Sequence, residues 1–343
     1  MPATPDRPVL ALPSSRHLLL AVAALSLIGL AIGGARAQDA AAPSAEPTPI
    51  YQPRAADLEP LASKGLMLDV VDTGKRLIAV GDRGHILASI DGQKWAQVSV
   101  PVRSALTAVR FVDAEHGWAV GHDAVVVATV DGGKTWQLQN FQPELEKPLL
   151  DIEFLDANTG FAVGGFGLVL RTEDGGGNWE PVSSPAFDTD ELNLYSITRL
   201  ADGDLLVTGE QGRLVLSSDR GRTWKRLKSP VNSTLFGAVA VPGGGALVCG
   251  LRGKAYLTRD VRAGAWRALD TATSAAFYGC TALDRARIAL VGDNGTIVIA
   301  DPASLATRKL AGETGTAYSS ATLWQSSLVV SGERGLQSLG RVR

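Results

Sequence analysis

A short glycine motif recurs seven times along this chain of 343 residues, and its spacing limits the folds that the chain can adopt. Each copy is an apolar run that ends in glycine, and a second glycine often follows three residues later. A nearly fixed period of this length is typical of repeat architectures, in which each copy is one supersecondary unit. The anchoring glycines are Gly81, Gly121, Gly164, Gly209, Gly250, Gly292 and Gly332, spaced by 40, 43, 45, 41, 42 and 40 residues.

One copy, residues 149–182, has the pattern of short antiparallel strands. Apolar and acidic side chains alternate in 150–154, which is the period of a half-buried strand. Turn-forming residues follow at 156–160, and the glycine turn at 164–167 joins two further apolar runs. Four short strands in every copy are the sequence signature of a propeller blade. We therefore predict an all-β protein, a seven-bladed β-propeller of four-stranded antiparallel blades.

The seventh copy is incomplete. It runs from about Thr316 and stops at Arg343 after three predicted strands. A blade without its outer strand leaves an open sheet edge, which proteins usually cover. We therefore expect the chain before the first blade, in the region 47–58, to supply the missing strand and so close the ring.

A second motif, which joins a hydroxyl, an acid, glycine and tryptophan, follows the third predicted strand. It reads TVDGGKTW at 129–136 and recurs with small changes in the first five copies. The hydroxyl and the carboxylate can accept hydrogen bonds from turn N–H groups, glycine permits a positive φ, and the indole buries a large apolar area. We interpret the motif as a fold device rather than a catalytic site. Its acids and indoles are Asp91, Trp95, Asp131, Trp136, Asp174, Trp179, Asp219, Trp224, Asp260 and Trp266.

The first 37 residues have the pattern of a secretory signal. Arg7 and Arg16 precede an uncharged, mostly apolar run at 18–35, and small residues occupy the two positions before Gln38 that a signal peptidase reads. We expect cleavage between Ala37 and Gln38 and a periplasmic or secreted protein. The alternative is an uncleaved anchor, for which the run is slightly short of the roughly 20 residues that span a bilayer.

The remaining chain divides into two parts. Residues 38–60 are rich in alanine and proline, which is typical of an exported linker, and they include the possible closing strand. Residues 61–343 form the predicted propeller. The chain has 33 basic and 35 acidic residues, so nothing suggests nucleic acid as a partner. Two cysteines, Cys249 and Cys280, could form a disulfide in an exported protein or pack as small apolar side chains.

The repeat resembles a known family. The segment LLDIEFLDANTGFAVGGFGLVLRTEDGGGNW at 149–179 is similar to the blades of photosystem II stability/assembly factors, and the resemblance extends over about 66–343. It implies a seven-bladed propeller without a cofactor that binds proteins and assists the assembly of a membrane complex. The acidic turn also resembles the Asp-box of sialidase-like propellers, in which the box is structural.

Photosynthetic members of the family are associated with an arginine-rich patch, and the chain offers a counterpart. The glycine turns of all seven blades should project on one face, where acids such as Asp82 and Glu333 would dilute the positive charge. Our hypothesis is that this face docks an acidic loop of a membrane-associated protein; the alternative is a set of ordinary solvated turn residues. The cations predicted for it are Arg83, Arg213, Arg252, Lys254 and Arg334.

An enzyme is the other function class that an Asp-box propeller allows. A sialidase-like glycoside hydrolase needs convergent groups at the centre of the ring, such as two carboxylates. The innermost predicted strands are mostly apolar, with polar exceptions at Asp151, Glu153, Tyr195, Arg199 and Tyr278. We therefore assign no catalytic residue and expect neither a cofactor nor a small-molecule substrate.

Metal chemistry has little support in the sequence. His85 and His122 follow the glycine turns of adjacent copies, but no third ligand accompanies them. We assign no metal site and expect both histidines to be exposed loop residues. The prediction as a whole is an exported, monomeric, non-catalytic scaffold whose partner is a membrane-associated protein or complex.

Overall fold

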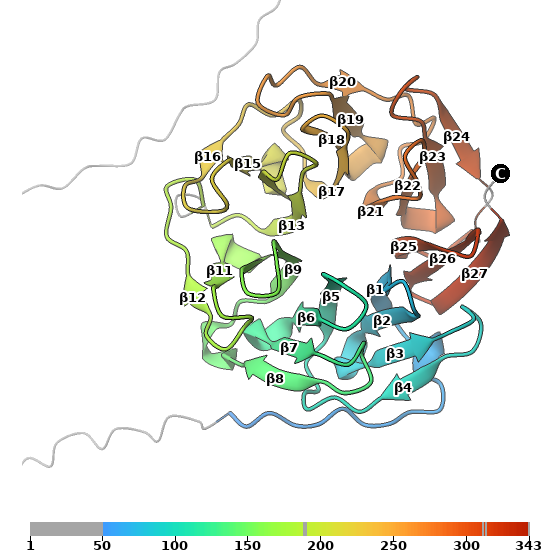
Figure 1. Ribbon diagram of the computed structural model, residues 1–343. Helices are drawn as coiled ribbons and strands as arrows, with labels where there is room; N and C mark the ends of the chain where they lie inside the picture. The colour runs from blue at the N-terminus through green and yellow to red at the C-terminus, as the bar shows by residue number, and fades with distance from the viewer. Residues whose placement is uncertain (1–50, 188–190, 311, 313, 342–343) are drawn as a thin grey trace, which may run out of the picture. The chain divides into compact units, whose positions relative to one another are not determined.

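The computed structural model describes residues 51–187, 191–310, 312 and 314–341. These residues form seven antiparallel sheets around a central channel (Figure 1), which confirms the predicted seven-bladed β-propeller. The first strand of each blade lies innermost and the last lies at the rim. The signal peptide predicted for 1–37 and most of the predicted linker lie outside the described residues.

The blades follow one another in chain order. The first holds β1 (Met67–Asp72), β2 (Leu77–Gly81), β3 (Ile86–Ser89) and β4 (Ala96–Val98), and the second holds β5 (Leu106–Phe111), β6 (Gly117–Gly121), β7 (Val126–Thr129) and β8 (Gln137–Asn140). The third holds β9 (Leu149–Phe154), β10 (Gly160–Gly164), β11 (Val169–Thr172) and β12 (Glu180–Pro181), and the fourth holds β13 (Leu194–Arg199), β14 (Leu205–Gly209), β15 (Leu214–Ser217) and β16 (Lys225–Arg226). The fifth holds β17 (Leu235–Val241), β18 (Gly245–Gly250), β19 (Ala255–Thr258) and β20 (Arg267–Ala268). The sixth holds β21 (Phe277–Ala282), β22 (Ile288–Gly292), β23 (Ile297–Ala300) and β24 (Thr307–Leu310), and the seventh holds β25 (Tyr318–Trp324), β26 (Ser327–Gly332) and β27 (Gly335–Arg341).

The helices of the described residues are all single 3₁₀ turns. None of them has the length and apolar character that a membrane span requires. Six of them join the second strand of a blade to the third. They are η1 (Ala62–Lys64), η2 (Asp82–Gly84), η3 (His122–Ala124), η4 (Pro143–Leu145), η5 (Gly165–Gly167), η6 (Glu210–Gly212), η7 (Leu251–Gly253) and η8 (Asp293–Gly295).

The anchoring glycines recur because two backbones approach closely at the end of each second strand. A Cβ atom on Gly121 would lie 1.9 Å from the carbonyl oxygen of Ala105, and one on Gly164 would lie 2.0 Å from that of Pro148. In each case the carbonyl belongs to the residue just before the innermost strand. Any larger residue would therefore push the second strand away from the first.

The tryptophans of the acidic turns pack between neighbouring blades. Trp136, from the second blade, lies in one buried cluster with Ile78 and Val80 of the first blade. It also meets Phe111 edge to face, with ring centroids 6.2 Å apart. The indole thus contributes its apolar area to the seam between two sheets, as the sequence predicts.

The acids of these turns bind their own backbone. Asp131 accepts hydrogen bonds from the N–H groups of Lys134 at 2.9 Å and Thr135 at 3.0 Å, while the Thr129 hydroxyl accepts from Gly133 at 2.9 Å. With burial opposing them, these hydrogen bonds lower the pKa of Asp131 to about 2. The same arrangement recurs at Asp91, Asp174 and Asp219, so these carboxylates are occupied in holding turns.

The seventh blade closes the ring without the expected strand. Its sheet has three strands in the described residues, and residues 51–58 form no strand. This segment lies instead along the first blade, where the N–H of Ala56 donates to the oxygen of Val100 at 3.0 Å. The expectation of a closing strand is therefore not met in 51–58, and 47–50 lie outside the described residues.

Side-chain packing joins the two ends of the propeller. β25 of the seventh blade and β1 of the first lie side by side (Figure 1). Trp324 and Val329 of the seventh blade share a buried cluster with Met67 and Leu77 of the first. In the described residues, apolar burial at this seam joins the first blade to the seventh.

The two cysteines meet between the fifth and sixth blades and are not bridged. A Cβ atom on Gly237 would lie 3.1 Å from the sulfur of Cys280 and 3.6 Å from that of Cys249. Glycine at this point of β17 leaves the space that both sulfurs fill. In this structure the pair packs with the apolar core, the second of the two alternatives.

Candidate functional site

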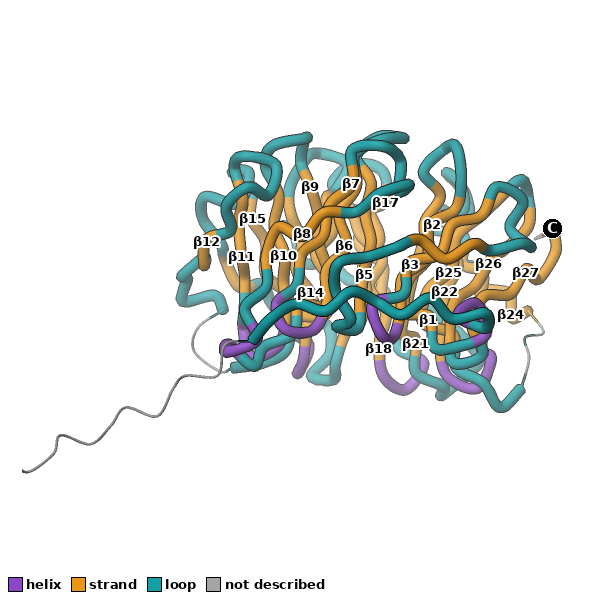
Figure 2. Tube along the Cα trace, turned by 90° about the horizontal axis from the view of Figure 1, so that it is seen from below, coloured by secondary structure: helices purple, strands orange, loops and turns teal. Residues whose placement is uncertain are grey.

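The turns between the second and third strands lie together along one side of the ring, which we call the turn face (Figure 2). Of the five cations predicted for it, Arg83, Arg252, Lys254 and Arg334 are exposed. The Arg83 guanidinium lies 2.9 Å from a carboxylate oxygen of Glu59 and 3.7 Å from one of Asp82. Part of the positive charge on the turn face is therefore matched by acids of the same chain.

Arg213 was predicted for this face, and that placement is wrong. Its side chain is buried, and its guanidinium donates a hydrogen bond to the carbonyl oxygen of Ala186 at 3.0 Å. Arg213 immediately follows η6, at the point where the chain turns back into the blade. Its charge consequently holds the loop that carries Ala186 and does not contribute to the exposed patch.

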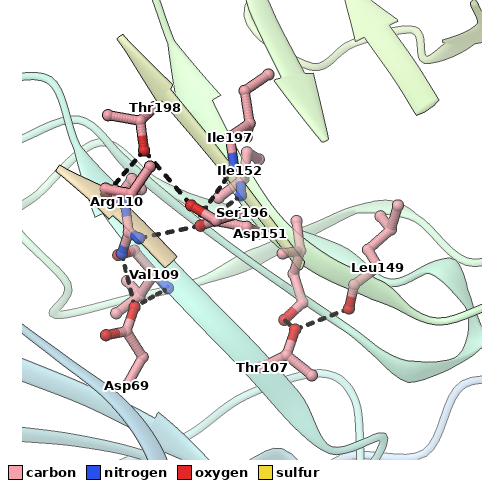
Figure 3. A network of polar contacts seen from close by, with 12 residues as sticks. Asp69, Thr107, Val109, Arg110, Leu149, Asp151, Ile152, Ser196, Ile197 and Thr198 are labelled. Carbon is pink, nitrogen blue, oxygen red and sulfur yellow. Dashed lines mark hydrogen bonds and ion pairs between the residues drawn. The ribbon is translucent and has the colours of Figure 1, made fainter. Parts of the chain in front are cut away.

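An arginine that the sequence analysis missed lies at the centre of the ring. Arg110, on β5, reaches the innermost strands of both neighbouring blades (Figure 3). One guanidinium nitrogen lies 2.7 Å from a carboxylate oxygen of Asp69 on β1, and another lies 3.0 Å from one of Asp151 on β9. We call these three residues the central clamp.

The two aspartates of the central clamp also bind backbone N–H groups across the blade seams. Asp69 accepts from Val109 of the second blade at 3.0 Å, and Asp151 accepts from Ile197 of the fourth at 3.0 Å (Figure 3). Both aspartates are buried. The clamp therefore ties four consecutive blades together from the inside.

The low dielectric of the channel wall shifts the ionisation of this cluster. Burial raises the pKa of Asp151, and it raises the pKa of the nearby Glu153 to about 7. Burial opposes the charge on Arg110, but the carboxylates of Asp151, Asp69 and Glu153 outweigh it and raise the pKa of the guanidinium. Arg110 accordingly stays charged, and Glu153 is the group of the cluster that can titrate near neutral pH.

The opposite wall of the channel carries aromatic rings. Tyr195, Phe236 and Tyr278 are the second residues of β13, β17 and β21, next to the turn face. Their ring centroids are 4.8 Å and 5.4 Å apart, each pair meeting edge to face. The sequence analysis noted the two tyrosines as polar exceptions but counted Phe236 as part of an apolar strand. The rings line part of a cavity of about 140 Å³ that is surrounded by the innermost strands of all seven blades.

Asp151 and Glu153 are the two channel carboxylates that could form a catalytic acid pair, and one of them is already bonded within the chain. Both oxygens of Asp151 are occupied, one by Ile197 and the other by Arg110 and the N–H of Ile152. Two carboxyl groups that cleave a glycosidic bond must both reach the substrate. Asp151 and Glu153 therefore serve first as part of the channel wall.

The histidines noted in the sequence do not come together as ligands. His85 is buried, contrary to its expected exposure, whereas His122 is exposed. In the part of the chain that the structure describes, no group of three His, Cys, Asp or Glu side chains is placed to hold a metal ion.

Comparisons with known proteins agree with the architecture. Residues 87–147 and 137–297 match the model of the family described as Photosynthesis system II assembly factor YCF48. The photosystem II assembly protein Ycf48 of Thermosynechococcus vestitus is 29% identical over 223 residues, 63% of this chain and 62% of that protein. The chloroplastic photosystem II stability/assembly factor HCF136 of Cyanidioschyzon merolae is 32% identical over 87 residues, 23% of this chain and 20% of that protein. The aligned region thus spans less than two thirds of either relative.

Solved structures share the fold at low sequence identity. YCF48 bound to D1 peptide superposes with a TM-score of 0.67 at 18% identity, covering 85% of this chain and 100% of that one. YCF48 from Cyanidioschyzon merolae gives the same TM-score at 16% identity, covering 83% of this chain and 98% of that one. These two likenesses establish the propeller fold.

Proposed function

The chain belongs to the Photosynthesis system II assembly factor YCF48 family, and from this membership we propose that it is a non-catalytic scaffold for the assembly of a membrane protein complex. The observation that carries the proposal is the family match, which extends over more than half of the chain. A related propeller has been solved with a D1 peptide bound, which supports a peptide segment of a membrane protein as the partner.

The signal-like segment at 1–37 supports a site of action outside the cytoplasm, in the periplasm or beyond. There a rigid disc could hold a segment of a membrane protein while other subunits join it. The glycoside hydrolase alternative is less well supported, because both oxygens of Asp151 are already bonded within the chain.

We propose the exposed cations of the turn face as the docking surface. Arg252 and Lys254 stand together at η7, and Arg83 and Arg334 occupy the corresponding turns of the first and seventh blades, which are neighbours in the ring. Guanidinium groups form paired hydrogen bonds with carboxylates, so this surface suits an acidic segment. Because Arg83 is already bound to Glu59, Arg252 and Lys254 should contribute most.

The proposal can be tested by reversing charge on the turn face. Arg83→Glu, Arg252→Glu and Arg334→Glu are combined in one chain, which is crosslinked in its native envelope and purified with its partners. Integral membrane proteins that the wild-type chain recovers should be lost, because the segment they offer is repelled.

The matched control reverses three exposed cations of the acidic turns, Lys94→Glu, Lys134→Glu and Arg222→Glu. These turns lie between the third and fourth strands, away from the turn face. The control should keep the partners. Full recovery with the turn-face variant, or equal loss with both variants, would contradict docking at the turn face.

A further inference from the structure

Three aromatic rings stand in a row at one side of the channel mouth. They belong to Tyr195, Phe236 and Tyr278, which occupy the same position on the innermost strands of three consecutive blades. No other blade has an aromatic residue at this position. The residues found there are Leu68, Thr107, Leu150 and Ser319.

These rings are only partly buried. The side chain of Tyr278 is 40% exposed, and Tyr195 and Phe236 are half-buried. Rings that served only to fill the seams would lie as deep as Phe161 or Phe277, which are fully buried. The row therefore presents ring surface to the channel mouth.

Several carboxylates belong to the turns near the row. An oxygen of Glu210 lies 3.4 Å from the hydroxyl of Tyr195. Burial raises the pKa of the Tyr278 hydroxyl, and the negative charges of Asp293 and Glu333 raise it further. These acids raise the pKa of the two tyrosine hydroxyls, while Arg252 and Arg334 occupy turns of the fifth and seventh blades on the same face. Glu210, Asp293 and Glu333 are each the first residue of a turn on the turn face, and we call them, with the three rings, the aromatic mouth.

The cavity that the rings line is small, and its charged lining residues pair with one another. Its wall includes Asp69 and Asp151, two carboxylates that share the single guanidinium of Arg110. Its volume of about 140 Å³ is well below that of a typical small-molecule pocket. The space suits one head group at the end of a flexible side chain rather than a whole ligand.

We propose that the aromatic mouth binds one cationic side chain, a lysine or an arginine, of a polypeptide partner. The faces of aromatic rings carry negative electrostatic potential and attract such a cation, and the carboxylates of Asp293 and Glu333 neutralise it. The site takes a cation, whereas the docking surface proposed above takes an acidic segment, and the two meet where Glu333 adjoins Arg334. A partner segment that carried both an acidic and a basic residue could use both surfaces.

The test uses the full chain and two short peptides, acetyl-Gly-Lys-Gly amide and its neutral analogue with norleucine in place of lysine. Binding is followed by calorimetry and by the NMR signals of the tyrosine rings. The lysine peptide should bind at least about tenfold more tightly than the norleucine peptide, since only the cation gains from rings and carboxylates. Equal affinity of the two peptides would overturn the proposal.

Variants locate the binding. Tyr278→Leu and, separately, Glu333→Gln should each weaken binding of the lysine peptide by about fivefold or more. The matched control is Asp82→Asn, which changes the first residue of the corresponding turn in the first blade, where the neighbouring position is Leu68. Unchanged affinity in both mouth variants, or equal loss in the control, would overturn the assignment. Glu333→Gln keeps the test valid if Tyr278→Leu fails to fold.

Choline distinguishes a polypeptide from a small quaternary amine as the source of the cation. Choline should bind more weakly than the lysine peptide; tighter binding of choline would overturn the polypeptide assignment. The triple charge reversal of the turn face should still bind the lysine peptide, because it removes no ring and no carboxylate of the aromatic mouth. Failure of the docking surface and failure of the aromatic mouth can therefore be told apart.

Discussion

The two sides of the central channel use polar groups in different ways. On the side of the first four blades, Arg110 is held between Asp69 and Asp151, and these aspartates also bind N–H groups of the neighbouring strands. On the side of the fourth to seventh blades, partly exposed rings stand near acids at the mouth, and two of these acids each accept a hydrogen bond from a backbone N–H group. Glu210 accepts from Asn193 and Glu333 accepts from Ala317.

This difference between the two sides suggests that the central clamp stabilises the fold and that the aromatic mouth binds a ligand. A charge that meets its countercharge and its hydrogen bonds within the chain contributes to a unique fold and has little left to offer a partner. Rings and carboxylates at an open mouth retain surface and field for a ligand. If this comparison holds, changes in the central clamp should affect stability, whereas changes in the aromatic mouth should affect binding.

The largest effect on stability is expected from Arg110→Met. The change leaves Asp69 and Asp151 buried beside each other without their cation, and the free energy of unfolding should fall by about 3–5 kcal/mol. Urea unfolding at neutral pH measures the loss. The matched control is Arg103→Met, whose exposed guanidinium lies 3.4 Å from Asp57 and which should cost about 0–1 kcal/mol. Similar small losses in both variants would show that the clamp does not hold the blades.

A smaller, pH-dependent effect is expected from Glu153→Gln. The pKa of Glu153 is raised to about 7 in the fold from an ordinary value of 4.5, so the folded state binds its proton more tightly than the unfolded state. Below pH 4.5 the wild-type carboxyl does not destabilise the fold. The free energy of unfolding falls as the pH rises from 4.5 to 7, and above pH 7 the carboxyl destabilises the fold to its full extent.

Glutamine should therefore stabilise the fold by about 1–3 kcal/mol at pH 8 and change it little at pH 4. Free energies of unfolding for the wild type and the variant at pH 4, 6 and 8 give the comparison. Two curves that run parallel over this range would contradict the raised pKa.

The blade architecture could be predicted because every local signal in a repeat agrees with the fold. The glycine at the end of the second strand, the alternation in the first strand and the acidic turn each act within a few residues, so their spacing reveals the period. The turn acids were interpreted as structural on the same local grounds, and the bonds from Asp131 to Lys134 and Thr135 are the ones that such a turn requires.

The central clamp could not be found in this way because its members lie one blade apart. Arg110 is 41 residues from Asp69, and no local pattern connects the two. A signal does exist: charged residues of opposite sign occupy the innermost strands of successive repeats, and aligning the copies with one another would have shown them facing. The aromatic mouth was missed for the same reason, since Tyr195, Phe236 and Tyr278 are recognised as a group only when the blades are superposed.

Two expectations that are not met in the described residues have other physical causes. Arg213 follows a turn that looks exposed in sequence, but the chain bends back at η6 and directs the side chain to Ala186. The closing strand was expected because an open edge is unfavourable, yet the seam between β25 and β1 is held by apolar packing that includes Trp324 and Leu77. Composition and periodicity do not predict whether a ring is closed by a hydrogen-bonded strand or by apolar packing between its first and last blades.

The smallest effects on stability are expected when a hydroxyl group is removed at either of two positions on β13. Tyr195→Phe removes a hydroxyl that lies 3.4 Å from Glu210 at the half-buried mouth and keeps the ring packed 4.8 Å from Phe236, so the free energy of unfolding should change by no more than about 0.5 kcal/mol. Thr198→Val removes a hydroxyl that donates to the carbonyl of Ala238 at 3.0 Å and joins the fourth blade to the fifth; it should cost about 1 kcal/mol. Paired urea titrations resolve the difference. If the tyrosine variant lost as much stability as the threonine variant, the Tyr195 hydroxyl would hold the fold as firmly as a hydrogen bond between two blades does, and the assignment of the aromatic mouth to binding rather than to stability would not hold.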